Sequence, residues 1–275
     1  MRFRGRIAGM VKITQLGALG AASTIMCVLF VGSPVAALCI RAVQEERLLA
    51  SLTSEAAMTA LRLSLGTSIA AMVIILVVGT PFAYVLARGK SSLLRVLDGL
   101  VELPLVLPPV VAGIAMLMAF GRGGILGPAL EAARISIVST SLAVVFAQLF
   151  VAAPFYIRSA KLGFQSVLVD YEEISQTLGV SPWRTFFRLT LPLAGPSIIT
   201  GIALAWARAL SEFGATMMFA GNMMGRTQTM PLAIMTAMET DLAVALALSA
   251  LLLVVSVGIL AGLTIASRRT WQSRW

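Results

Sequence analysis

The sequence lacks histidine altogether, holds only two cysteines, and draws just 12% of its 275 residues from the charged types. The absence of histidine excludes Ser-His and Cys-His catalytic pairs and most zinc sites. The charged share is about half the ~25% of soluble domains, which excludes a soluble enzyme. Cys27 and Cys39 do not form a C-x-x-C motif and are interpreted as small apolar residues. No catalytic residue and no metal site is therefore predicted.

Long apolar runs take the place of the missing charge, and hydrophobic residues make up 59% of the chain. A helix needs about 20 apolar residues to cross the hydrocarbon core of a membrane. We interpret six runs as transmembrane helices, at residues 16–40, 63–87, 97–120, 137–157, 192–213 and 242–266. The first run is too long for the ~7–15-residue apolar region of a signal peptide. The prediction is an all-α membrane protein of six transmembrane helices, with the first in residues 1–60, a core in 61–267 and a short tail in 268–275.

Basic residues outnumber acidic ones by 21 to 12, and they fall unevenly between the two sides of the predicted helices. Fourteen lie on one side: Arg2, Arg4, Arg6, Lys12, Arg88, Lys90, Arg95, Arg158, Lys161, Arg184, Arg188, Arg268, Arg269 and Arg274. Six lie on the other, Arg41, Arg47, Arg62, Arg122, Arg134 and Arg226, and the remaining one, Arg208, lies within a predicted span. Because Lys and Arg are enriched in cytoplasmic loops, both termini are predicted to be cytoplasmic. The bases do not cluster on one solvated face, so no nucleic-acid partner is expected.

Residues that break helices lie inside four of the predicted spans. They are Gly79 with Pro81, Pro104 with Pro108 and Pro109, Pro154, and Gly195 with Pro196. An interruption of the helical hydrogen bonds is tolerated within the membrane only where the backbone packs on protein or lines a water-filled cavity. This pattern predicts a translocation path that includes Pro104, Pro108 and Pro109, with plain helix packing as the alternative.

The predicted cytoplasmic loop 158–191 has the signals of two short helices. Asp170 is expected to cap the first, with Glu173 reaching back as in a capping box. Gly179 can end that helix in the left-handed conformation. Ser181 then caps a second helix, with Pro182 at its first position. The loop is therefore predicted to be a helix-turn-helix that lies on the inner face of the membrane, in contact with the lipid bilayer.

The same loop resembles the EAA loop of ABC-importer permease subunits, written E-A-A-x3-G-x9-I-x-L-P. Its spacing is met throughout by Glu173, Ile174, Ser175, Gly179, Leu189, Leu191 and Pro192. Ile174 and Ser175 replace the alanines, and Leu189 replaces the isoleucine. The resemblance implies the type I importer fold, with these residues docking onto an ATP-hydrolysing partner subunit.

Further stretches are similar to the molybdate permease branch of that family, to which sulfate permeases are closely related. They are residues 103–113, 207–216, 220–222 and 225–232, with Ser211 standing where the branch often has glycine. The resemblance implies import of molybdate, or alternatively of tungstate or sulfate, across the cytoplasmic membrane of a bacterium or archaeon. It also implies a homodimer with two ATP-binding subunits. A stand-alone secondary transporter is the alternative from another class, although six spans without an internal repeat are few for one.

The chain itself is not expected to bind ATP. Gly89-Lys90-Ser91 looks like the end of a P-loop, but Tyr84 occupies the place of its first glycine. ATP and magnesium are therefore expected on the partner subunits, with no cofactor in this chain.

Two groups of residues are candidates for handling the anion. The resemblance implies that a periplasmic or surface-tethered binding protein contacts the outer segment 214–241, and Asn222, Arg226 and Thr227 are the expected contacts. Within the fifth span, Ser197 and Thr200 either line the path or bond their own helix carbonyls. Arg208 and Glu212, four residues apart, form either a gate for the anion or a self-neutralised packing pair.

Overall fold

The structure is a computed structural model that describes residues 17–45 and 48–272, and every regular element in that part is helical. The elements in chain order are α2 (Gly17–Val43), α3 (Leu48–Leu52), α4 (Glu55–Arg88), α5 (Ser92–Val106), α6 (Pro109–Phe120), α7 (Gly127–Ala132), α8 (Ser141–Ser166), α9 (Val169–Thr177), α10 (Pro182–Thr185), the π-helical turn η2 (Phe186–Thr190), α11 (Leu191–Leu193), α12 (Gly195–Leu210), α13 (Gly214–Phe219), α14 (Met230–Thr240) and α15 (Leu242–Gln272). The predicted all-α class is confirmed for this part of the chain.

Four of the described helices are long and apolar enough to cross a membrane. They are Gly20–Val43, Glu55–Arg88, Ser141–Ser166 and Leu242–Ile265. A fifth candidate is a bent pair, Pro182–Leu193 with Gly195–Leu210, whose two parts meet at 71°. The count of six continuous spans is therefore not reproduced, and several helices run past their predicted ends.

The predicted span 97–120 is not a single helix, which agrees with the break expected at its prolines. It is divided into α5, which ends at Val106, and α6, which begins at Pro109. Pro109 cannot donate a backbone hydrogen bond, and the residue before a proline avoids the helical conformation. By contrast, Pro81, Pro104 and Pro154 lie inside continuous helices. Of the predicted breaks, only those at Pro108 and at Gly195 separate two helices.

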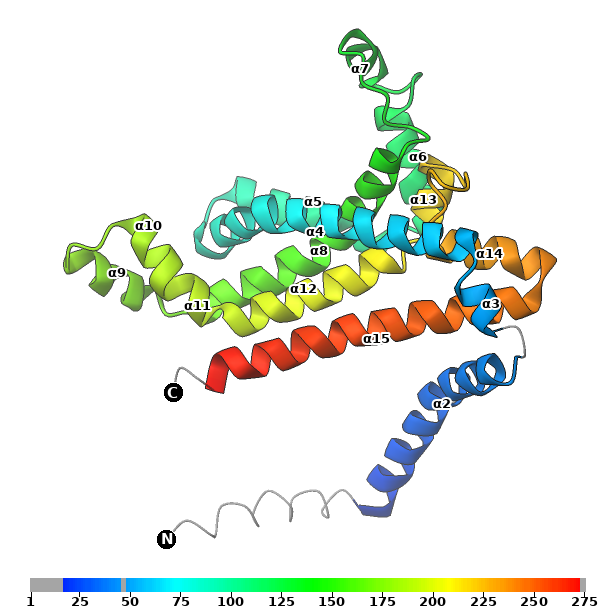
Figure 1. Cartoon of the computed structure of the whole chain (residues 1–275). Helices are drawn as coiled ribbons and strands as arrows, with labels where there is room; N and C mark the ends of the chain where they lie inside the picture. The colour runs from blue at the N-terminus through cyan, green and yellow to red at the C-terminus, as the bar shows by residue number, and fades with distance from the viewer. Residues whose placement is uncertain (1–16, 46–47, 273–275) are drawn as a thin grey trace.

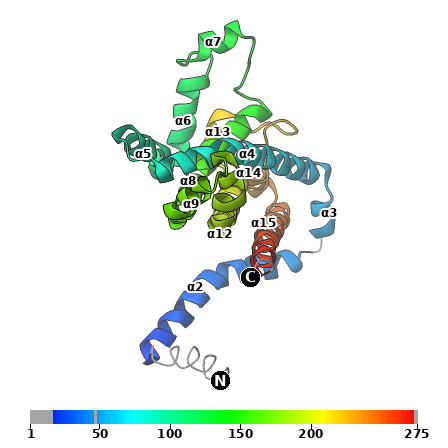
Figure 2. The same ribbon diagram turned by 90° about the vertical axis from the view of Figure 1, so that its left-hand side faces the viewer.

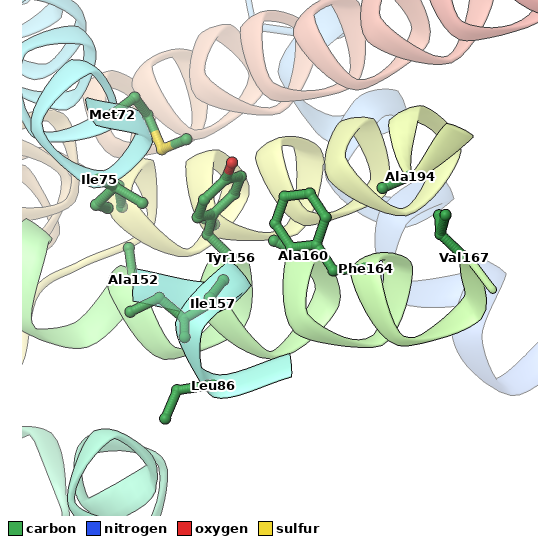
Figure 3. Close-up of a cluster of buried hydrophobic side chains, with 13 residues drawn as sticks. Met72, Ile75, Leu86, Ala152, Tyr156, Ile157, Ala160, Phe164, Val167 and Ala194 are labelled. Atoms are coloured by element: carbon green, nitrogen blue, oxygen red, sulfur yellow. The ribbon is translucent and has the colours of Figure 1, made fainter. Parts of the chain in front are cut away.

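Helices α4, α8 and α12 lie side by side and form the core of the bundle (Figures 1 and 2). Helix α4 begins at a cap in which Ser54 Oγ accepts the N–H of Ala57 at 3.2 Å. Figure 3 shows Tyr156 and Phe164 of α8 among the buried side chains of this core. Gly79 permits the close approach of α4, because a Cβ there would lie 3.2 Å from the Tyr156 ring. Helix packing therefore fixes α4 against α8 along much of their length.

The short helices gather at the two ends of this bundle. Helices α9, α10 and α11 lie at one end, together with the C-terminal end of α15, while α3, α13 and α14 lie at the other (Figure 1). Helix α8 continues to Ser166, nine residues past its predicted end, toward α9. Helix α2 leans away from the bundle (Figures 1 and 2). The predicted cytoplasmic bases Arg2, Arg4, Arg6 and Lys12 lie outside the described residues.

Candidate coupling and translocation sites

Residues 169–193, which we call the α9–α11 hairpin, form the predicted helix-turn-helix. Gly179 has φ +80°, so the predicted left-handed turn is confirmed. Pro182 occupies the first turn of α10, also as predicted. The predicted capping box is wrong, because α9 begins two residues earlier, with Leu168 at the cap position and Asp170 inside the first turn. Within the described hairpin, Ser181 takes the cap position of α10 without a side-chain bond.

The hairpin exposes large apolar side chains around its turn. Trp183 is 74% exposed and Leu178 is 78% exposed, and Ile174 is exposed beside them on α9. The Trp183 ring meets the edge of Phe187 at 4.7 Å between centroids. An exposed apolar patch of this kind marks a surface that binds another protein or the membrane. The hairpin therefore has the composition of a docking surface.

The residues that match the EAA pattern divide into two sets. Glu173, Ile174 and Gly179 are exposed, so they can reach a partner. Ser175 is half-buried, and its hydroxyl lies 2.9 Å from that of Thr185, which joins α9 to α10. The remaining members, half-buried on η2 and α11, lead from the hairpin into α12: Leu189, Leu191 and Pro192. The second set maintains the fold of the hairpin and does not form its exposed surface.

Glu172, which belongs to none of the motifs described above, is the buried acid of this hairpin and is 6% exposed. Arg88 Nη2 lies 2.7 Å from its Oε1, and Thr190 Oγ1 donates to the same oxygen at 2.8 Å. Tyr84 Oη and Arg88 Nε donate to Oε2 at 3.1 and 3.3 Å. Burial opposes the charge of Glu172, but the bonds from Arg88 and Thr190 outweigh it and hold its pKa below the ordinary value. Glu172 is therefore an ionised anchor at this end of α4.

At the opposite end of the bundle, Arg208 and Glu212 form an ion pair across one turn. Arg208 Nη2 lies 2.6 Å from Glu212 Oε2, and the Glu212 side chain is 0% exposed. The other carboxylate oxygen accepts the N–H of Ala215 at 2.8 Å. The contact neutralises the acid within the described chain and also links the end of α12 to the first turn of α13. This arrangement fits the packing interpretation of the pair.

The other predicted path residues lie in two separate places. Pro109 packs beside Gly214, two residues from Glu212, since a Cβ on Gly214 would lie 2.7 Å from Pro109 Cβ. Pro108 is exposed and Pro104 is half-buried within α5. Ser197 and Thr200 lie near the start of α12, about 16 Å and about 12 Å along the helix from Arg208 at 1.5 Å per residue. The structure therefore places Pro109 against Gly214, in the segment that follows the ion pair, but does not place the two hydroxyls there.

Thr200 and Ser197 of α12 have contacts within the bundle. Thr200 Oγ1 donates to Pro196 O of its own helix at 2.9 Å. Ser197 faces α8, because a Cβ on Gly163 would lie 2.6 Å from Ser197 Cβ. Ser159 of α8 donates its hydroxyl to the Ser197 carbonyl at 2.6 Å. In this conformation both residues serve helix structure and packing.

The three residues expected to meet a binding protein have different surroundings. Arg226 is exposed. The Ser141 hydroxyl donates to the backbone carbonyl of Arg226 at 2.8 Å and so holds the loop in place. Asn222 donates to Thr236 Oγ1 of α14 at 2.9 Å. Thr227 is 0% exposed, and its hydroxyl accepts the N–H of Met223 at 2.9 Å. Thr227 as a surface contact is therefore a wrong prediction, because its side chain organises the loop from inside.

Comparison with known proteins gives consistent matches over most of the chain. Residues 79–271 match the family described as "Binding-protein-dependent transport system inner membrane component". The molybdenum transport system permease protein ModB of Mycobacterium tuberculosis is 46% identical over 235 residues, which cover 86% of this chain and 89% of that protein. The sulfate transport system permease protein CysW of Synechococcus elongatus is 39% identical over 63% of this chain and 60% of that protein.

A solved structure shares the fold. It is the crystal structure of a bacterial alginate ABC transporter in complex with an alginate pentasaccharide-bound periplasmic protein, one chain of which matches with a TM-score of 0.72. The match covers 96% of this chain and 98% of that chain, at 17% identity. The all-helical arrangement is therefore that of a known ABC importer membrane subunit.

Proposed function

The chain belongs to the family of binding-protein-dependent transport system inner membrane components, and from this premise we propose that it is the membrane-spanning subunit of an ATP-driven molybdate importer. The observation that supports molybdate as the substrate is the 46% identity to a molybdenum permease over 86% of the chain. Family membership and the apolar helices make it a multi-pass protein of the bacterial inner membrane. Like its relatives, it is a translocation component, and a partner chain hydrolyses the ATP.

We further propose that two copies of the chain assemble with two ATP-binding subunits, which hold the ATP and the magnesium. The exposed apolar side chains of the α9–α11 hairpin support this, because they form a docking surface at one end of the bundle. A periplasmic or surface-tethered oxyanion-binding protein delivers the anion at the opposite end. The related alginate transporter, which was solved with a periplasmic protein, supports that partner.

The proposed mechanism is a rocking of the two copies about a path between them. A dianion bound by strong opposite charges would be held too tightly to leave, so conduction favours weak, repeated sites. The neutralised Arg208–Glu212 pair agrees with this requirement, because it presents no isolated positive charge to trap the anion. Closure of the ATPases would move the α9–α11 hairpins and thereby switch the path from outward to inward access.

The direct test is uptake of radioactive molybdate by bacteria that lack their own permease. Cells that produce this chain with its ATPase and binding protein are expected to accumulate molybdate, and to stop when cellular ATP is exhausted while the ion gradient is kept. Uptake that continues under those conditions would establish a secondary transporter instead.

Sulfate is the second candidate cargo, favoured by the 39% identity to a sulfate permease. Tungstate has the same shape and charge as molybdate and is a further candidate. Competition by unlabelled sulfate and tungstate in the same uptake assay separates the cargoes. We expect tungstate to compete and sulfate to compete poorly.

A further inference from the structure

Building on the proposed function, we propose that Glu172 is a positioning residue that ties the α9–α11 hairpin to the end of α4. Through this contact, a displacement of the hairpin by the ATPase is passed to α4 instead of being absorbed in the loop. Glu172 does not touch the cargo or ATP in this role. It acts through Arg88 of α4 and Thr190 of η2, which hold its carboxylate on two sides.

The first support is the geometry of the carboxylate. Glu172 lies on α9, yet all its side-chain bonds run to other elements: to Tyr84 and Arg88 of α4, and to Thr190 of η2. Thr190 is fully buried and Glu172 is nearly so. Charge-assisted bonds are shorter and stronger than neutral ones, and a buried ion pair is poorly screened by salt. The contact is therefore built as a rigid connection.

The second support is that the same arginine also holds the end of α8. Arg88 Nη2 donates to the Val167 carbonyl at 3.1 Å, directly after the last residue of α8. Arg88 thus connects α4, α8 and α9 at one point. A hairpin held by these contacts cannot tilt without moving the helices to which it is tied.

Aromatic side chains form a parallel connection to the exposed face of the hairpin. The Tyr84 ring meets Phe164 of α8 at 5.5 Å and Phe186 of η2 at 5.0 Å between centroids. Phe186 in turn meets Phe187 at 5.1 Å, and Phe187 meets the exposed Trp183 at 4.7 Å. Edge-to-face pairs at these separations are favourable beyond simple burial. The docking surface is therefore continuous with the side chains that surround Glu172.

The third support is the reach of α4. This helix is continuous for 34 residues, so its two ends move together. Near its other end Ser64 Oγ accepts the N–H of Met230, the first residue of α14, at 2.7 Å. Movement at Arg88 is thereby passed to the end of the bundle where α13 and α14 lie. Glu173, the neighbour of Glu172 that matches the EAA pattern, is exposed and does not occupy the buried position between α9 and α4.

The test compares transport with ATP hydrolysis in the purified complex of this chain, its ATPase and its binding protein, reconstituted in proteoliposomes. For Glu172→Gln we expect the ATPase to remain bound and to hydrolyse ATP at close to the wild-type rate. Molybdate uptake per ATP is expected to fall by about ten-fold, the size of a typical coupling effect between sites. Glu172→Asp should restore part of this ratio, since it keeps the charge.

The matched control is Glu102→Gln, which removes an acid from an exposed pair with Arg158 at 4.0 Å. It should leave uptake per ATP unchanged. The proposal is overturned if Glu172→Gln keeps the wild-type ratio, or if the ratio changes only because the ATPase no longer binds.

A spin-label measurement keeps the test independent of the cargo. Labels are placed at Val85→Cys on α4 and Gln176→Cys on α9, both exposed positions, after Cys27 and Cys39 have been replaced by alanine. The distance distribution should be narrow in the complex with and without ATP, and Glu172→Gln should broaden it. An unchanged distribution contradicts the inference, whereas a wild-type complex that takes up no molybdate contradicts only the proposed function.

Discussion

Arg208 and Glu212 stand one helical turn apart at the end of α12, with Nη2 of the arginine 2.6 Å from Oε2 of the acid. The acid is fully buried and the arginine is partly exposed, so the acid depends on the arginine for its charge balance. This dependence allows the two interpretations of the pair, gate or packing, to be separated by paired substitutions.

We expect Arg208→Ala to abolish uptake because it leaves a buried, unpaired carboxylate, which costs about 3 kcal/mol of folding free energy. Combining Arg208→Met with Glu212→Gln removes both charges and should restore the thermal unfolding midpoint and most of the uptake. Thermal unfolding in detergent and molybdate uptake are the two measurements. If the neutral pair folds normally but still does not transport, the positive charge acts on the anion itself.

Trp183 is expected to anchor the ATPase, because it is more exposed than the other exposed aromatic side chains of the hairpin, Tyr171 and Phe187. Trp183→Ala should lower co-purification of the ATPase by about ten-fold, as for a central interface residue worth 1–2 kcal/mol, without changing thermal stability. Leu93→Ala on α5, also an exposed apolar residue, is the control and should have no effect. Full retention of the ATPase by Trp183→Ala would show that docking lies elsewhere.

The pH dependence of stability should report the charge of Glu172. Its pKa is lowered in the folded chain, so the stability it contributes is present above the ordinary carboxyl pKa and is lost as pH falls through the lower, folded value. The thermal midpoint of Glu172→Gln should therefore lie below that of the wild type near pH 7. This difference should shrink below about pH 4, where carboxyl groups protonate. A difference that grows toward low pH would contradict the assignment.

Gly179→Ala tests the turn between α9 and α10. An alanine at φ +80° is strained and should cost about 1 kcal/mol, although nothing nearby would clash with its Cβ. Gly179→Asn should cost less, because asparagine tolerates the left-handed region. The thermal unfolding midpoints of the two variants and of the wild type show whether alanine is more destabilising than asparagine. Equal midpoints for all three would mean that the turn relaxes elsewhere.

Thr227→Ala should loosen the loop between α13 and α14. The loss of the hydroxyl leaves the Met223 N–H without its acceptor and costs about 1–2 kcal/mol. Thr227→Val, which keeps the shape, should be as damaging, whereas Thr227→Ser should be mild.

Arg226→Ala is expected to weaken stimulation by the binding protein without lowering stability. Thermal unfolding and binding-protein-stimulated ATP hydrolysis separate the two effects.

The elements that the sequence predicted well are those set by local chemistry. The turn at Gly179 and the start of α10 at Pro182 follow from backbone preferences of single residues. Long apolar runs likewise predicted α2, α4, α8 and α15, because a helix must satisfy its own backbone in lipid. The division at Pro108 also follows from local chemistry, because two consecutive prolines mark this span as broken.

Glu172 could not be predicted in the same way. It sits beside Glu173, and nothing in their residue type says which of the two is buried. Its partners Tyr84 and Arg88 are more than 80 residues away in the chain, so only the packing of α9 against α4 identifies it. The burial of Thr227 is hidden for a similar reason, because the resemblance implies that its segment contacts a binding protein but does not say which side chains of that segment face outward.

Helix α2 has a consequence for how the protein is made. It is 27 residues long, about 40 Å at 1.5 Å per residue, and none of its most apolar window is buried against the described part of the chain. Such a helix satisfies its own backbone hydrogen bonds and needs no neighbour to be stable in lipid. It can therefore enter the bilayer during translation, before α4 and α8 exist to receive it, and fix the direction in which every later helix is threaded.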